Sequence, residues 1–158
     1  MSIESRLSEL NLQLPPAPPK GGVYQPVLLQ GNLAYFSGHG PYKADGTYIT
    51  GKVGADIDLA AGQEAARQTG LAILASMRER LGSLDRIKRV IKLLGMVDCP
   101  PDFKEHPQVI NGCSELYRDL FGEDAGVGVR SAIGMGSLPG GISVEIEGVF
   151  EISEDYSF

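Results

Sequence analysis

The sequence predicts an α+β fold in which a mixed β-sheet carries two helices on one of its faces. Two long segments place apolar residues at helical spacing, several short segments alternate apolar and polar residues, and one segment is almost continuously apolar. Their order along the chain is β-β-(β)-α-β-α-β-β, which is typical of helices packed as a layer on a sheet. Because the helices need only one face, we expect a homo-oligomer that packs through the other face.

Composition and charge exclude several classes of protein. The 158 residues fit one domain, and 42% hydrophobic with 22% charged residues is typical of a globular chain. The net charge of −6 argues against a nucleic-acid partner. No apolar run could span a membrane and no secretory signal is recognisable, so we expect a cytoplasmic protein. Cys113 lies on an apolar helical stripe, Cys99 at a strand end that could be exposed, and their spacing matches no zinc motif, so no metal is expected.

The N-terminal part divides into an arm, residues 1–20, and the start of a main domain, residues 21–158. The arm contains a short amphipathic helix over residues 1–10, capped by Ser2, and then a stiff proline-rich connector over residues 14–20. The main domain opens with two strands. They cover residues 24–30 and 33–37 and flank the hairpin turn Gly31-Asn32, and a further short strand is expected over residues 47–50.

Two helices and a long strand form the middle of the predicted domain. The first helix covers residues 59–81, with Asp58 as its cap and Gly82 as its stop, and its alanine-rich side can lie close on a sheet. The strand covers residues 87–98, and its apolar content suits a central position covered on both faces. The second helix covers residues 107–121, opening with a proline and ending before a glycine.

Two alternating runs form the last strands, and a turn over residues 137–141 is expected to bring them side by side. We expect the apolar set of each run to face the core. These sets are Val127, Val129, Ile133 and Met135 in the first run, and Ile142, Val144, Ile146, Phe150 and Ile152 in the second. The opposite face would then hold Arg130 and Ala132 among glycines, together with Glu145, Glu147 and Glu151.

A single arginine among small residues, opposite a glutamate-bearing strand, indicates a recess that binds a carboxylate. The alternative is structural: Arg130 forms an ion pair with Glu145 or Glu147 at a subunit interface. The neighbouring glycines favour space for a ligand or for a closely packed second chain.

The same residues resemble a known family. Val129-Arg130-Ser131-Ala132-Ile133, then Leu138-Pro139, then Val144-Glu145-Ile146-Glu147 is similar to the C-terminal signature of the Rid family, the YjgF-like reactive-intermediate deaminases. Tyr24, Gly31-Asn32 and Ser37-Gly38 with Pro41 resemble the first hairpin of that family. Asn111 resembles an asparagine near the start of its second helix.

The resemblance implies a chorismate-mutase-like fold, a homotrimer with clefts between subunits, and cofactor-free hydrolysis. Its substrates would be enamines and imines such as 2-aminoacrylate, and its products 2-keto acids and ammonia. Arg130 would hold the substrate carboxylate through two parallel hydrogen bonds. Glu145 would position or activate water, and Tyr24, Ser37 and Asn111 would line the same cleft.

The chain departs from the family pattern at two positions. Ala132 stands where many active members carry cysteine, and His39 stands where glutamine is usual. His39 is either a proton carrier at the cleft or a residue with a hydrogen-bonding role. The alternative to a deaminase is therefore a non-catalytic trimer that binds small carboxylates, such as 2-keto acids, as a sensor or partner module.

Overall fold

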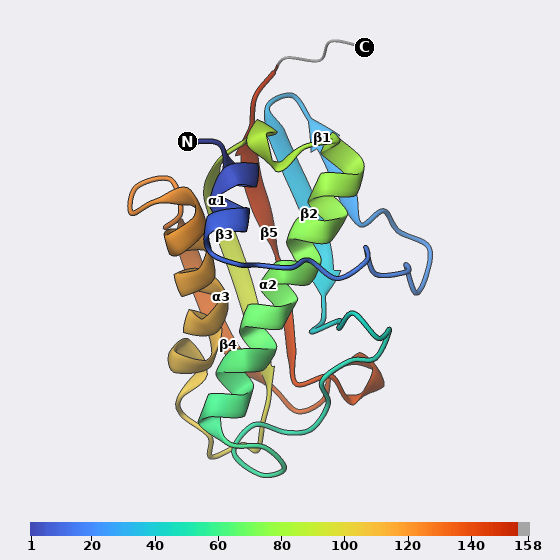
Figure 1. The fold of residues 1–158 in the computed structure, drawn as a ribbon. Helices are drawn as coiled ribbons and strands as arrows, with labels where there is room; N and C mark the ends of the chain where they lie inside the picture. The colour runs from blue at the N-terminus through green and yellow to red at the C-terminus, as the bar shows by residue number, and fades with distance from the viewer. Residues whose placement is uncertain (155–158) are drawn as a thin grey trace.

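In the computed structural model, which describes residues 1–154, three helices lie on one face of a five-stranded sheet (Figure 1). The helices are α1 (Ile3–Glu9), α2 (Leu59–Leu81) and α3 (His106–Phe121). The strands are β1 (Val27–Gln30), β2 (Leu33–His39), β3 (Ile87–Asp98), β4 (Val129–Met135) and β5 (Val144–Ile152). Short 3₁₀ turns η1 (Leu84–Arg86) and η2 (Pro139–Gly141) precede β3 and β5. The predicted α+β class is confirmed, and residues 155–158 of the predicted main domain lie outside the described part.

Helix α2 begins and ends where the sequence predicts. The Asp58 side chain accepts a hydrogen bond from the backbone N–H of Ala61, and Gly82 ends the helix at φ 83°. Left-handed backbone of this kind favours glycine because a side chain there would be strained. Helix α3 packs tightly on α2 because Gly112 has no side chain: a Cβ at this position would lie 2.9 Å from the Gln63 carbonyl carbon. The close packing of the two helices gives the sheet one fully covered face.

The sheet has the order β1-β2-β5-β3-β4, and β3 is the strand that separates the two C-terminal strands. It pairs with β5 in antiparallel and with β4 in parallel orientation. The expectation that β4 and β5 lie side by side is therefore wrong. The physical reason is that β3 is long and largely apolar, so both of its edges recruit strands. The connection over residues 136–143 then passes the end of β3.

Three smaller differences concern the ends of strands. Strand β1 begins at Val27 rather than at residue 24, since Pro26 has no N–H to donate to a neighbouring strand. Strand β2 continues to His39. Residues 47–50 form isolated bridges, Tyr42 with Tyr48 and Thr50 with Ile142, instead of a strand.

The prediction of which side of β4 faces the helices was wrong. The side that carries Arg130 and Ala132 faces the helices, and the apolar side does not. The register pairs Arg130 with the buried Leu93, which places Arg130 and Ala132 on the helix side. Val129 is 67% exposed and Ile133 is 40% exposed on the other side. The alternation distinguishes two faces but does not tell which one the helices cover. The glycines agree with the observed orientation: a Cβ at Gly134 would meet the side chain of His106 in α3, so the small residues lie on the side that the helices cover.

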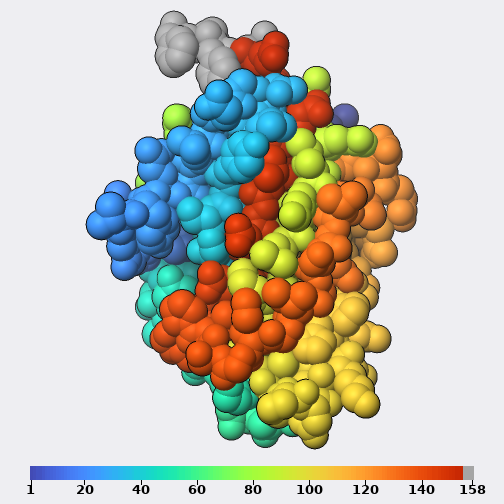
Figure 2. Space-filling view, turned by 180° about the vertical axis from the view of Figure 1, so that it is seen from behind, coloured from blue at the N-terminus to red at the C-terminus, as the bar shows by residue number. Residues whose placement is uncertain are grey.

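The face of the sheet opposite the helices, called here the open face, carries no helix layer in the single chain, and the orange segment before β5 lies over its lower part in the view from behind (Figure 2). Its exposed apolar side chains come from strands at both ends of the sheet: Leu28, Tyr35, Val129 and Ile133. Strand β3 is covered on both faces only near its C-terminal end, where Leu138 and Ile142 pack on Met96. The predicted two-sided burial of β3 is therefore correct for one end alone. No helix within residues 1–154 is long and apolar enough to cross a membrane.

Candidate functional site

A hollow of about 720 Å³ lies at the end of β2 and the start of β5, on the open face. It brings together three of the residues predicted for the site: Tyr24, Ser37 and Glu145. Aromatic and apolar groups form much of the remaining lining: Pro19, Tyr48, Pro139 and Ile142. A mostly apolar recess with a few polar groups is the usual form of a small-molecule site.

Glu145 supplies the acidic group of this hollow. Burial raises the pKa of the Glu145 carboxyl above its usual range, and the nearby negative charge of Glu147 raises it further. A carboxyl with a raised pKa can take and return a proton closer to neutral pH than an ordinary glutamate can. The position is therefore chemically suited to activate water.

Gly38 makes room for the Glu145 carboxyl. Strand β2 shifts its register against β5 between Phe36 and His39, and Gly38 lies in this irregular segment. A Cβ at Gly38 would lie 2.9 Å from Cδ of Glu145 and still closer to one of its oxygens. Irregular strand segments of this type often direct side chains at active sites.

Replacing Gly38 with alanine is expected to displace the Glu145 carboxyl, because the added methyl needs the space that it occupies, and to lower about tenfold or more any reaction rate that depends on this carboxyl. A crystal structure of the variant should show the Glu145 side chain in another rotamer. The matched control is Gly136→Ala, since no atom lies within 4 Å of a Cβ at Gly136. Equal activity of both variants would show that the position of the carboxyl does not matter.

The hydroxyl groups near Glu145 are partly engaged. Ser37 Oγ donates to the Gln25 carbonyl oxygen at 2.5 Å, so its lone pairs alone remain for a ligand. The Tyr24 hydroxyl accepts from the backbone N–H of Gly21 at 3.0 Å and keeps its own proton to donate. Together they offer an acceptor and a donor beside the carboxyl.

The structure places His39 outside this hollow. Its side chain is on the helix side of β2 and only 6% of the residue is exposed. Nδ1 lies 2.6 Å from the Ser37 carbonyl oxygen, which can only accept, so Nδ1 carries the proton and Nε2 accepts from Ser76 Oγ at 2.8 Å. Burial lowers the pKa of His39, which favours the neutral ring. The geometry matches the hydrogen-bonding interpretation of His39, not a proton carrier.

Arg130 lies on the other side of the sheet, against α3. Its Nη1 donates to Asn111 Oδ1 at 2.8 Å and to Ser114 Oγ at 3.0 Å. A recess of about 270 Å³ beside it includes Asn111, Ser114 and the glycines before β4. The structure therefore brings the predicted Arg130 and Asn111 together. Sequence reasoning missed Ser114, although its spacing of three residues from Asn111 places both on one helix face.

The guanidinium of Arg130 is held by neutral acceptors. None of the ion pairs among residues 1–154 includes Arg130, so the predicted alternative of an ion pair with Glu145 or Glu147 does not form within one chain. Ala132 follows two residues later on the same face and packs against the main core. A fixed cation without an acidic partner is suited to bind an anion.

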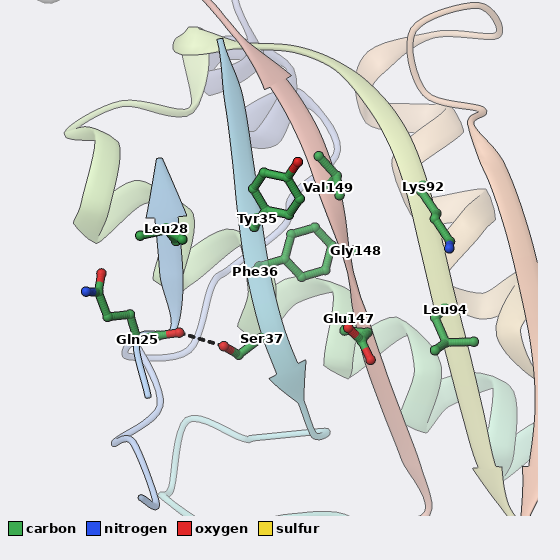
Figure 3. Close-up of a pocket in the computed structure, with 10 residues that line it drawn as sticks. All are labelled: Gln25, Leu28, Tyr35, Phe36, Ser37, Lys92, Leu94, Glu147, Gly148 and Val149. Carbon is green, nitrogen blue, oxygen red and sulfur yellow. Dashed lines mark hydrogen bonds between the residues drawn. The ribbon is translucent and has the colours of Figure 1, made fainter. Parts of the chain in front are cut away.

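The two parts of the candidate site therefore lie on opposite faces of the sheet. Glu145 pairs with Met96 of β3 on the open face, whereas Arg130 pairs with Leu93 on the helix side. The open face also holds a second depression of about 510 Å³, which Tyr35, Leu94 and Val149 line together with the charged Lys92 and Glu147 (Figure 3). In a single chain, Arg130 and Glu145 cannot contact the same small molecule.

The cysteines and the remaining charged groups do not extend the site. Cys99 is buried rather than exposed, and Nε2 of His106 at the start of α3 lies 3.4 Å from its sulfur. Burial raises the pKa of the Cys99 thiol, which disfavours the nucleophilic thiolate. Lys52 bonds the buried Asp98 at 2.6 Å. Within residues 1–154 no group of three side chains is placed to hold a metal ion.

The fold and the site define a small α+β protein with an acidic hollow on one sheet face and a fixed cation on the other. Residues 4–138 match the family described as "YjgF/chorismate_mutase-like, putative endoribonuclease". The chain therefore belongs to the YjgF/chorismate mutase-like family, as its C-terminal signature predicts.

Individual relatives agree with this assignment. Protein TCP17 of Trypanosoma cruzi is 36% identical over 151 residues, which cover 96% of this chain and 94% of the relative. The structure of Atu1372 from Agrobacterium tumefaciens, a protein of unknown function, is 44% identical with a TM-score of 0.86, over 96% of this chain and 94% of that chain. RidA from the Antarctic bacterium Psychrobacter sp. PAMC 21119 is 25% identical with a TM-score of 0.62, over 89% of this chain and 97% of that chain.

Proposed function

We propose that the protein hydrolyses reactive enamines and imines of the 2-aminoacrylate type to 2-keto acids and ammonia. The observation that carries this proposal is the Arg130 guanidinium, which neutral groups fix in place and which forms no ion pair within residues 1–154. Such a group binds a substrate carboxylate through paired hydrogen bonds. The likeness to RidA agrees with this chemistry.

The proposed reaction needs no group beyond the side chains and water. Glu145 takes a proton from water while the water oxygen bonds to the imine carbon, and the C=N π electrons move to nitrogen, which takes up a proton. The resulting carbinolamine loses ammonia as the C–N bond breaks and the proton on Glu145 passes to nitrogen. The hydroxyl becomes the keto group by releasing its proton to solvent, which balances the proton that nitrogen took from solvent in the first step. Because the substrate is already reactive, orientation by Arg130 and delivery of water supply most of the acceleration.

The division of the site between two sheet faces supports assembly from several copies. In the homotrimer proposed here, the Arg130 side of one copy meets the Glu145 hollow of the next copy and completes a cleft. The apolar open face offers a surface for such contacts, since exposed apolar patches mark interaction sites. RNA is a poorer ligand for this site, because the acidic Glu145 is the charged group that lines the hollow.

The direct test is to generate 2-aminoacrylate enzymatically and to follow the release of ammonia and pyruvate with and without the protein. The proposal expects faster release of both products in equal amounts. Unchanged rates with this substrate and with bulkier imines would refute deaminase activity. The result would then favour the alternative, a non-catalytic trimer that binds small carboxylates. The alanine at position 132, where many active members carry cysteine, agrees with that alternative.

Mixing two inactive variants tests whether the cleft is shared. Arg130→Ala and Glu145→Gln chains, refolded together in equal amounts, should regain about a quarter of the wild-type activity, since one cleft in four would receive both intact residues. Each variant alone should stay inactive. Mass spectrometry of the intact assemblies must show mixed species. Mixed species without any regained activity would mean that both residues act from the same copy.

A further inference from the structure

The N-terminal strap, defined here as residues 11–24, forms one wall of the Glu145 hollow. It runs from α1 across α2 to the outer edge of β1 (Figure 1). Leu12 and Leu14 pack against the main core along the way. Beyond them the strap contributes Pro19, Gly21 and Tyr24 to the lining of the hollow. A segment outside the sheet and the two main helices thus reaches the candidate site.

Helix α1 fastens the start of the strap. The Glu4 carboxylate accepts from Nε and Nη2 of Arg78, at 3.2 and 2.6 Å, and from the backbone N–H of Leu84 at 3.0 Å. Leu7 is buried in the core on the same helix. A helix of seven residues is not stable alone, so these contacts hold it in place. The position of the strap therefore depends on Glu4.

A second part of the lining of the hollow comes from a different loop. Tyr48 lines it together with Ile142, and Gly40 allows both to pack closely: a Cβ there would lie 2.9 Å from Ile142 Cδ1 and 3.1 Å from the Tyr48 ring. The Tyr42 ring supports Tyr48, with 5.1 Å between ring centroids. Both parts of the lining thus present aromatic rings and no lysine or arginine.

We propose that the strap and Tyr48 select substrates with an apolar, ring-bearing side chain over the small 2-aminoacrylate. This inference rests on the function proposed above. Arg130 would bind the carboxylate, and Glu145 would activate the water that bonds to the imine carbon. The substrate side chain then enters the space between Tyr24 and Tyr48. Aromatic walls bind such a group through apolar contact and ring stacking. Glu4 is a positioning residue, because it acts through the strap.

The experiment compares kcat/KM for two substrates, the imine derived from phenylalanine and 2-aminoacrylate. An auxiliary enzyme generates each of them in the assay. Wild type should prefer the aromatic imine. Tyr48→Ala should lower kcat/KM for that imine about tenfold, mainly through KM, and reduce the preference, since one lost side-chain contact has an effect of this order. Tyr48→Phe, which keeps the ring, should retain the preference.

The strap is tested with Glu4→Ala, and Glu9→Gln serves as the control, because the exposed Glu9 carboxylate accepts from Arg6 of the same short helix. Glu4→Ala should raise KM for the aromatic imine and leave kcat near the wild-type value. Equal losses for both imines would overturn the specificity inference and leave the deaminase proposal intact. No hydrolysis of either imine by wild type would instead refute the proposed function itself.

Discussion

Replacing Arg130 with alanine is expected to lower kcat/KM for 2-aminoacrylate about a thousandfold, because the substrate carboxylate loses its cationic partner. Two charge-assisted hydrogen bonds to a carboxylate contribute together about 4 kcal/mol, and each 1.4 kcal/mol corresponds to a factor of ten. Asn111 and Ser114 hold Nη1, so the guanidinium is already oriented before substrate binds. Steady-state release of ammonia measures the loss, and calorimetry with a 2-keto acid measures the lost binding.

Two further variants separate charge from geometry. Arg130→Lys keeps the positive charge but cannot form the paired hydrogen bonds, so it should recover only a small part of the activity. Arg80→Ala is the control, since Arg80 is exposed on α2, away from the open face. An Arg130→Ala variant with wild-type KM and kcat would show that the carboxylate is bound elsewhere.

Replacing Glu145 with glutamine should abolish most turnover while ligand binding stays close to wild type. Glutamine has nearly the same shape but cannot accept a proton from water, and loss of a general base typically lowers kcat about a hundredfold to ten-thousandfold. A non-catalytic binder would lose little in the same variant. The comparison of kcat with the affinity for a 2-keto acid therefore separates the deaminase from the binder.

The dependence on pH gives a second measure of Glu145. Its carboxyl must be ionised to accept a proton, so activity should fall as the pH drops through its raised pKa, at a higher pH than an ordinary glutamate would give. Glu147→Gln removes the adjacent negative charge and should shift this fall to lower pH. An unshifted profile would mean that another group controls the rate.

The raised pKa also affects the stability of the fold. Because the folded pKa of Glu145 lies above the unfolded value, the ionised carboxyl disfavours folding. This penalty is absent below the unfolded pKa and complete above the folded pKa. Thermal unfolding at neutral pH should therefore show a slightly higher Tm for Glu145→Gln, whereas the difference should vanish at low pH.

The helices and the long strand were predictable because their ends are set locally. Asp58 and Gly82 define α2 through short-range hydrogen bonds and backbone conformation, and the predicted ends of β3 are also confirmed. The partners of β4 depend instead on long-range pairing. A turn over residues 137–141 is compatible with a hairpin, but only the apolar length of β3 explains why it lies between β4 and β5.

Part of the candidate site was predictable from the sequence, but its arrangement was not, and the predicted residues His39 and Ala132 lie on the packed helix side, outside the hollow. Tyr24, Ser37 and Glu145 meet in one hollow, and Arg130 meets Asn111, as expected for groups of one cleft. The prediction that Arg130 and Glu145 share a sheet face was wrong, since a period of two does not reveal which face the helices cover. Tyr48 and Ser114 belong to no sequence motif, so they were not predicted as site residues. Only the folded structure shows that Tyr48 lines the hollow and that Ser114 contacts Arg130.

The separation of Arg130 and Glu145 by the thickness of the sheet has a consequence for the cell. Under the proposed function, a newly made chain would complete its fold and still be inactive, because folding alone does not bring Arg130 and Glu145 together. Under the proposed assembly, activation becomes a second event that depends on meeting other copies. The proposed activity would then rise more steeply than protein abundance at low expression, because the number of complete clefts depends on how often copies meet.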